Sequence, residues 1–215
     1  MTYALLDMTI IIYYGRHMSQ IKQEPPIKLA APGDGISFPQ RLLMTFYVRP
    51  FVAEKAKIED SKKRFIKISE KILKEIEGLS ETQMTQQVLV PPQKGLEDSS
   101  RFWSIAMTLE HLGIVGRKMI LGIEMISAGH KPPQKVEIAK YKPINEMSAQ
   151  ESIQDFQKFI TTDFSNMKIS NPDSPITLRH PWFGEMKTKG FVWLLGVHQG
   201  LHLQQIREIK KGLKK

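Results

Sequence analysis

The sequence of 215 residues predicts an all-α protein, a four-helix bundle with an irregular N-terminal extension. Three observations lead to this fold class. Four segments repeat apolar residues at helical spacing, serine residues suited to cap a helix precede two of them, and proline and glycine interrupt the chain between them. Apolar residues make up 41% of the chain, enough for a sizeable core in one domain. We therefore assign residues 41–215 to the bundle and residues 1–40 to the extension.

The N-terminal extension concentrates proline and glycine between positions 25 and 39, which is typical of irregular chain. Residues 8–14 (MTIIIYY) are apolar, but Asp7 precedes them and no small-residue cleavage site follows. We interpret this segment as a short strand or a packed arm rather than a signal peptide. Met18 and Met44 are further candidates for the first residue. No run of 18 apolar residues occurs, so the sequence predicts no membrane-spanning helix.

The first two long helices follow from apolar stripes. The first is predicted from Phe51 to Glu77, and Gly78 ends it. Its stripe consists of Ile58, Phe65, Ile68 or Ser69, Ile72 and Ile76. The second is predicted to begin after Ser104 as N-cap and to run to about Ile126. It is apolar on much of its surface, as expected for a central helix.

The third helix is predicted from the spacing of Ser148 and Glu151, which matches a capping box, and its apolar residues extend to Phe164. The fourth is predicted with Thr188 as N-cap and an end near Lys211. The first, second and fourth predicted helices can each exceed 20 residues, about 30 Å, so they can lie side by side, and the four helices together predict a bundle.

The charge and the missing cysteines exclude several classes of function. The chain has no cysteine, which rules out disulfides, zinc thiolates, iron–sulfur clusters and cysteine nucleophiles, and fits a cytoplasmic location. The net charge is +9, and the last nine residues hold five cations and one acidic residue. We interpret this tail as a helix end that faces the negative pole of the helix dipole. Few aromatic residues interleave with it, so we do not expect a nucleic-acid partner.

His198 and His202 are four residues apart and leave one face of the fourth predicted helix. A buried imidazole needs partners for both ring nitrogens, and two adjacent protonated rings would repel each other. A divalent cation would resolve both problems. The alternatives are a hydrogen-bonded core pair or a helix rotated so that both rings face solvent. The other members of the same heptad seam are Phe191, Leu195, Gln205 and Ile209.

His111 lies midway along the second predicted helix, where a third imidazole would complete a three-nitrogen face. Three protein ligands leave a fourth position open, as in catalytic zinc sites. Zinc and nickel are the ions we expect first, and ferrous iron also suits imidazole ligands. Gln205 could hydrogen-bond a ligand histidine, a substrate or the backbone. Glu110 points roughly 100° away from His111 around the helix, so we do not assign it as general base.

The remaining histidines are not ligand candidates. Pro181 keeps His180 out of helical geometry, so we interpret His180 as a residue of a turn or a pocket rim. His17 and His130 are predicted to lie in exposed loops.

Several motifs resemble those of the DinB-like (YfiT-like) superfamily of metal-dependent enzymes. Residues 103–106 (WSIA) and 109–112 (LEHL) resemble its second helix, and residues 180–184 (HPWFG), 190–194 (GFVWL) and 198–206 (HQGLHLQQI) resemble its fourth helix and the preceding turn. The similarity covers residues 51–212. It implies an up-down-down-up bundle with a divalent metal ion on His111, His198 and His202.

The resemblance also implies a function. It suggests metal-dependent hydrolysis of a small molecule, or transfer of a low-molecular-weight thiol, and it implies a homodimer. No residue beyond the three histidines stands out as catalytic, apart from Gln205 as a support for one of them. The alternative is a metal-binding or protein-interaction module without turnover.

Overall fold

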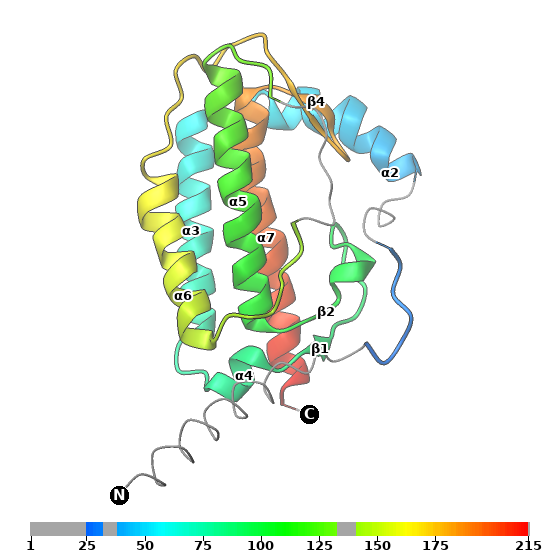
Figure 1. The fold of residues 1–215 in the computed structure, drawn as a ribbon. Helices are drawn as coiled ribbons and strands as arrows, with labels where there is room; N and C mark the ends of the chain where they lie inside the picture. The colour runs from blue at the N-terminus through cyan, green and yellow to red at the C-terminus, as the bar shows by residue number, and fades with distance from the viewer. Residues whose placement is uncertain (1–24, 32–37, 133–140, 215) are drawn as a thin grey trace, which may run out of the picture.

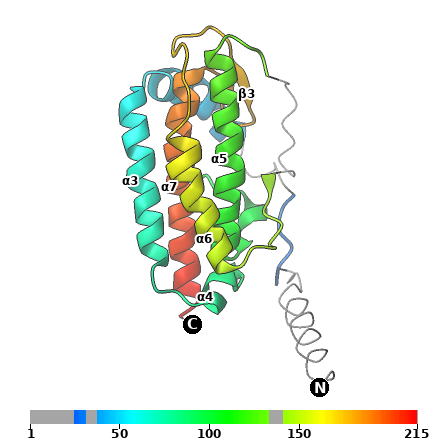
Figure 2. The same ribbon diagram turned by 60° about the vertical axis from the view of Figure 1, so that its left-hand side comes forward.

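The computed structural model describes residues 25–31, 38–132 and 141–214. Its four long helices are α3 (Ile58–Ile76), α5 (Ile105–Ser127), α6 (Ala149–Lys158) and α7 (Thr188–Gly212), and a π-helix, η4 (Phe159–Phe164), continues α6. They lie side by side (Figures 1 and 2), α3 and α7 in one direction and α5 and α6 in the other. The predicted all-α, up-down-down-up bundle is confirmed.

Aromatic rings fill the space between α3 and the third helix of the bundle. Phe65 of α3 stacks on Phe164 with ring centroids 3.8 Å apart and meets Phe159 edge-on at 5.6 Å. α5 packs against both α6 and α7, which is why most of its surface is apolar and buried. Gly116 allows the close approach of α5 to η4, because a Cβ there would lie 2.1 Å from Cζ of Phe159.

Two serine residues cap their helices as predicted. Ser104 Oγ accepts a hydrogen bond from the Met107 amide at 3.1 Å. Ser148 and Glu151 form the complete capping box, each side chain accepting from the other's amide. The predicted N-cap of the fourth helix is wrong by one residue, because Thr188 is already helical and Lys187 holds the N-cap position.

The predicted first helix from Phe51 to Glu77 is wrong at its N-terminal end. Two separate helices occupy this region. α2 (Phe38–Leu43) continues into a π-helix, η1 (Met44–Ala53), and α3 begins only at Ile58. The intervening residues are not helical, and Lys57 has an extended backbone with φ −74° and ψ 133°.

Long-range hydrogen bonds explain why the chain breaks there. Thr45 Oγ1 donates to the carbonyl oxygen of Trp182 at 3.3 Å, and an Arg49 guanidinium nitrogen donates to that of Glu185 at 2.8 Å. Both acceptors lie about 136 residues further along the chain. These contacts direct η1 onto a hairpin rather than along the axis of α3.

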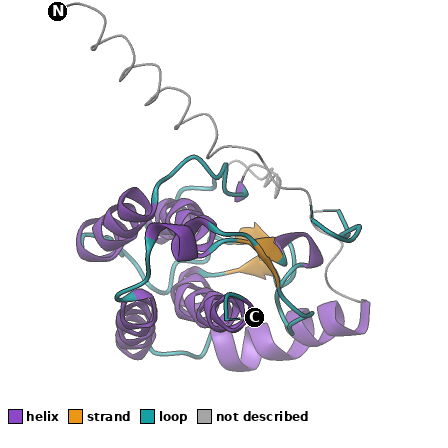
Figure 3. Ribbon diagram, turned by 90° about the horizontal axis from the view of Figure 1, so that it is seen from below, coloured by secondary structure: helices purple, strands orange, loops and turns teal. Residues whose placement is uncertain are grey.

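Short elements connect the long helices. They are α4 (Glu81–Thr85), a 3-10 turn η2 (Asp98–Ser100), and two antiparallel pairs, β1 (Val88–Leu89) with β2 (Phe102–Trp103) and β3 (Leu178–His180) with β4 (Gly184–Met186). Val88 pairs with Trp103 in the first sheet, and Leu178 pairs with Met186 in the second. The strands gather on one side of the helices (Figure 3). Gly184 has φ +69°, a conformation that suits glycine in the tight hairpin turn.

Residues 25–31 form no helix or strand, and the predicted arm at 8–14 lies outside the described residues. Among the helices of the described ranges, none combines the length and the apolar character that a membrane crossing requires.

Candidate metal centre

Three histidine side chains converge between α5 and α7. One ring nitrogen from each of His111, His198 and His202 can be chosen so that all three lie within 4.8 Å of one another. The ring centroids are 5.2 Å apart for His111 and His198, 4.8 Å for His111 and His202, and 4.6 Å for His198 and His202. Tetrahedral coordination at about 2.0–2.1 Å needs nitrogen separations of roughly 3.3 Å. A shared ion would therefore require the three donors to move closer together than they lie here.

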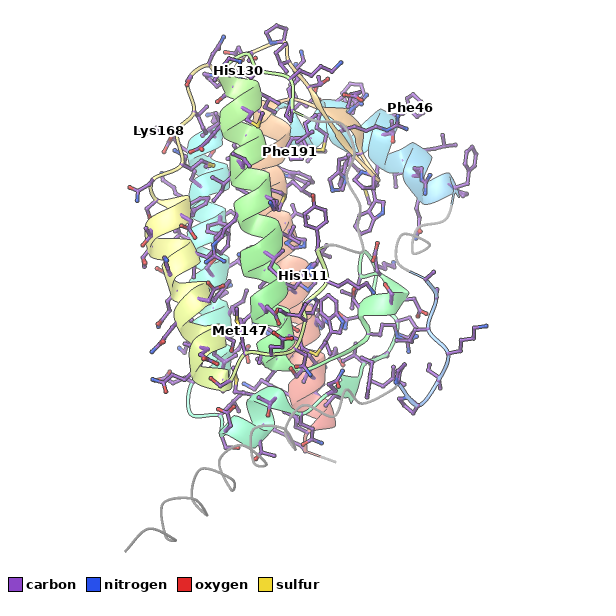
Figure 4. The ribbon with its side chains drawn as sticks, in the orientation of Figure 1. Phe46, His111, His130, Met147, Lys168 and Phe191 are labelled. Atoms are coloured by element: carbon purple, nitrogen blue, oxygen red, sulfur yellow. The ribbon has the colours of Figure 1, made fainter. Side chains whose placement is uncertain are left out.

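The helices position these rings for simple geometric reasons. His198 and His202 are one turn apart on the face of α7 that continues the buried seam of Phe191, Leu195, Gln205 and Ile209. His111 comes from the neighbouring antiparallel helix, midway along the bundle (Figure 4). The three predicted ligands thus meet although 87 residues separate the first from the second.

A backbone carbonyl sets the tautomer of His111. Nδ1 of His111 lies 2.7 Å from the carbonyl oxygen of Tyr141. A carbonyl oxygen can only accept, so Nδ1 carries the hydrogen and Nε2 keeps its lone pair. This is the arrangement by which proteins orient a histidine toward a metal ion.

Gln205 sets the tautomer of His202 in the same way. The Gln205 amide nitrogen donates to the carbonyl oxygen of Ser100 at 2.7 Å, which directs its Oε1 toward His202. Oε1 accepts from His202 Nδ1 at 2.7 Å, so Nε2 of His202 is free as well. Gln205 is completely buried. Of the roles predicted for Gln205, the structure shows contacts with the histidine and with the backbone.

His198 differs from the other two. Within the described parts of the chain, no polar group hydrogen-bonds its ring. Its two nitrogen atoms therefore remain available for a ligand. Trp103 covers the site from another side. Its ring lies parallel to that of His202, with an interplanar angle of 8° and ring centroids 6.1 Å apart, and its centroid is 4.9 Å from that of His111.

All three imidazoles are neutral at physiological pH. Burial, assisted by the nearby His202, lowers the pKa of His111 to about 3, and burial lowers that of His202 to about 4. Burial, followed by the charges of His202, His111 and His180, holds the pKa of His198 well below the ordinary 6.5. Neutral imidazole is the form that binds a metal ion, so protons compete weakly for these nitrogens.

A cavity of about 210 Å³ opens beside the three histidines. Its walls are mainly apolar, and its charged residues are Lys118, Lys142 and Arg179 against Glu97. The space suits a small organic molecule with an apolar body. Apolar side chains of the wall include Leu96, Val115, Met119, Phe191, Leu194 and Leu201.

The other histidines take different places. His180 ends β3 and lines the cavity, as predicted for a pocket-rim residue. Its Nδ1 accepts from the amides of Trp182 and Phe183 at 3.2 and 3.4 Å, so it shapes the turn. His130 is exposed after the end of α5, as predicted, and His17 lies outside the described residues.

Glu110 has a role that the sequence did not indicate. Its carboxylate accepts from the amides of Ile144 and Asn145 at 2.9 and 3.2 Å. Burial raises the pKa of Glu110, and these two hydrogen bonds act in the opposite direction. Glu110 therefore clamps the segment that brings the Tyr141 carbonyl to His111. Its partners lie in irregular chain, where periodicity gives no signal.

Together the fold and the site define a four-helix bundle protein with a three-histidine group compatible with metal binding. The family model of the DinB superfamily matches residues 64–206, so this chain belongs to that superfamily. The matched range includes all three histidines and Gln205.

Comparisons with solved structures and with curated proteins add little to this family assignment. A solved structure, the crystal structure of TT2238, a four-helix bundle protein, resembles this chain at 16% identity and a TM-score of 0.47. The alignment covers 70% of this chain and 98% of TT2238. No curated protein matches this sequence.

Proposed function

We propose that this chain is a divalent-metal-dependent enzyme in which His111, His198 and His202 hold the ion and the adjoining cavity holds a small-molecule substrate. One observation carries the proposal. Three neutral imidazoles meet at the wall of a cavity, and hydrogen bonds at Nδ1 leave Nε2 free in two of them. A metal ion held by histidines requires this donor set and this placement of protons.

The donor set also bears on the identity of the ion. Three neutral imidazoles suit zinc, nickel or ferrous iron, and zinc or nickel is the ion we expect first. When bound by three protein ligands, such an ion supplies Lewis-acid chemistry at an open fourth position.

The cavity residues support a reaction on an electrophilic small molecule. The apolar walls can hold an apolar body and exclude water from it. Lys118, Lys142 and Arg179 outnumber Glu97 and favour a substrate or co-substrate with a negatively charged end. The nucleophile is either water, which makes the protein a hydrolase, or a low-molecular-weight thiol, which makes it a transferase. A thiol must come from a co-substrate, because the chain has no cysteine.

The C-terminal cations support a small-molecule function rather than nucleic-acid binding. Arg207 and Lys210 both pair with Glu75 of α3, and Lys211 pairs with Glu208. Cations already engaged with carboxylates add little to the attraction of a phosphate backbone. Their contacts agree with a helix end packed against its neighbour.

Metal analysis tests the ligand set. We expect about one equivalent of divalent metal per chain in the purified protein and none in His198→Ala. Inductively coupled plasma mass spectrometry of the dialysed proteins measures this content. His180→Gln is the matched control, because His180 lines the same cavity but is not one of the three. Full metal content in His198→Ala, or its loss only in His180→Gln, would contradict the assignment.

Turnover distinguishes the enzyme from a metal-binding module. The metal-loaded protein is incubated with a panel of electrophiles that comprises esters, amides, epoxides and alkyl halides. Each reaction is run with and without a small thiol. Product formed in water alone indicates a hydrolase, and product formed only with thiol indicates a transferase. Absence of turnover with intact metal binding would leave the metal-binding or interaction module as the better interpretation.

A further inference from the structure

The cavity beside the three histidines is lined by a cation that is partly buried and has no carboxylate partner. Lys142 lines this cavity, and its ammonium group donates to the carbonyl oxygen of Ser99 at 3.1 Å. Among the described residues, no carboxylate forms an ion pair with it. An ammonium group has three donors, so two of them are left for a ligand.

Three other partly buried cations of the described ranges are paired with carboxylates. Arg101, Arg117 and Lys210 lie 2.6–3.0 Å from the carboxylate oxygens of their partners. Lysine is rarely buried without a partner, because moving its charge out of water is unfavourable. Burial lowers the pKa of Lys142, as this penalty requires, and the charge of Glu97 acts in the opposite direction. A negatively charged ligand would supply the missing partner.

Lys142 is held close to His111. The preceding residue, Tyr141, places its carbonyl oxygen 2.7 Å from Nδ1 of His111, and Glu110 holds two amides a little further along the same segment. Besides burial and His202, the charge of Lys142 lowers the pKa of His111, as expected for an ammonium group near that ring. An anion bound by Lys142 therefore lies beside the three histidines.

The apolar part of the cavity extends away from Lys142. It follows α5 from His111 and α7 from His198 for two helical turns each, or about 11 Å. Because these helices are antiparallel, both stretches lead toward the β3–β4 hairpin, and Phe191 lies at that end in Figure 4. An apolar chain fits along them. The apolar residues of the two stretches are Val115, Met119, Phe191 and Leu194.

The remaining cations of the cavity are less suited to hold an anion. Lys118 and Arg179 lie at the hairpin end, and both are exposed. Water and salt screen an exposed charge more than a partly buried one. Glu97 also lines the cavity, and its charge opposes a second negative charge near Lys142. A single ammonium group with Glu97 nearby therefore suits a carboxylate better than a phosphate, which carries nearly two negative charges.

We propose that Lys142 binds the carboxylate of a substrate whose apolar chain extends toward the hairpin. This inference rests on the proposed function, because it names the class of substrate for the same site. In this orientation the group that reacts lies near the carboxylate, at the three histidines, rather than at the far end of the chain. Lys142 is thus a residue that positions the substrate and determines specificity.

Two probes that share an alkyl chain and differ in charge, octanoate and octanamide, test the proposal by calorimetric titration with and without zinc. We expect the wild type to bind octanoate at least about tenfold more tightly, which is the effect of one charge-assisted hydrogen bond. Lys142→Gln should lose this preference and keep its affinity for octanamide. Lys118→Gln removes an exposed lysine from the other end of the same cavity, so it should change the octanoate affinity by less than about threefold.

Glu97→Gln provides a second test that leaves Lys142 in place. It removes the nearby negative charge, so octanoate should bind at least about threefold more tightly, with no gain for octanamide. Circular dichroism checks the fold of each variant, and Glu97→Gln decides the question if Lys142→Gln is unfolded.

Several outcomes overturn the proposal. A wild type that binds neither probe, or binds both equally, refutes it, and so does a Glu97→Gln variant without the gain for octanoate. Equal losses of both probes in Lys142→Gln would show a structural role, and a preference lost only in Lys118→Gln would place the anion at the hairpin end. Zinc binding without a preference for octanoate would refute this inference alone. A preference that depends on Lys142 in a protein that takes up no zinc would contradict only the proposed function.

Discussion

Replacing Gln205 with leucine should weaken metal binding and stability together. The leucine side chain would leave two buried groups without partners, the His202 Nδ1–H and the Ser100 carbonyl oxygen, each now bonded at 2.7 Å. A buried unpaired group costs roughly 1–3 kcal/mol, and leucine regains a part through apolar burial, so we expect a loss of about 2–4 kcal/mol. Losing the residue that orients a ligand histidine typically lowers metal affinity about 10–100-fold.

Two assays separate the effects of Gln205→Leu. Urea unfolding of the metal-free protein, followed by circular dichroism, gives the loss of stability. Titration against a chromophoric chelator gives the affinity for zinc. Gln205→Glu keeps an acceptor for His202 but loses the donor to Ser100, so it should be less stable than the wild type while retaining most of the affinity. Gln204→Leu is the control, because Gln204 is exposed, and it should change stability by less than about 0.5 kcal/mol. An unchanged zinc affinity in Gln205→Leu would refute this account of how His202 is oriented.

Three further predictions concern pH, the loop clamp and packing. The pKa values of about 3 for His111 and about 4 for His202 lie below the 6.5 of an exposed imidazole, so the unfolded chain takes up protons first. Metal-free stability should therefore be complete above pH 6.5 and fall toward pH 4, by roughly 1.4 kcal/mol per histidine at pH 5.5, in urea titrations at successive pH values. Glu110→Gln should lower zinc affinity several-fold in the chelator titration, because one amide of the clamped segment loses its acceptor. Gly116→Ala should destabilise the protein by about 1–3 kcal/mol through the clash with Phe159, whereas Gly200→Ala, whose nearest contact is 3.7 Å, should stabilise it by about 0.5–1 kcal/mol in thermal unfolding.

Specific results would contradict these predictions. Metal-free stability that rises as the pH falls from 7 to 5 would mean that the buried histidines are protonated in the folded state. Equal zinc affinity in Glu110→Gln and the wild type would mean that the loop holds its position without the clamp. Equal effects of the two glycine substitutions would mean that Phe159 moves aside at little cost.

The parts of the fold that depend on near neighbours could be predicted from the sequence. Ser104 and Ser148 cap helices because a cap involves residues three positions away. The break before Ile58 could not be predicted in this way. It depends on Thr45 and Arg49 bonding a hairpin about 136 residues away, and no local pattern contains that information.

In the candidate site, too, only the features that depend on regular helical spacing could be predicted from the sequence. The meeting of the three histidines followed from helical spacing together with the family resemblance, because both reflect regular helices. The groups that orient them are the carbonyl oxygens of Tyr141 and Ser100. Backbone atoms carry no signature in a sequence, and both residues lie in 3-10 turns within the connections between the long helices. Gln205 was a candidate partner because it shares the seam of His202, while its second contact with Ser100 spans 105 residues.

The cavity and the aromatic cluster lie in different parts of the bundle. The cavity takes much of its wall from the connections around residues 95–103, 141–142 and 178–182, whereas Phe65, Phe159 and Phe164 pack between α3 and the third helix. Substitutions in those connections can change which molecules fit without removing the contacts that keep the chain folded. The substrate range can therefore change by substitutions in these connections while the fold is retained. A library of variants confined to these three connections should yield mostly folded proteins.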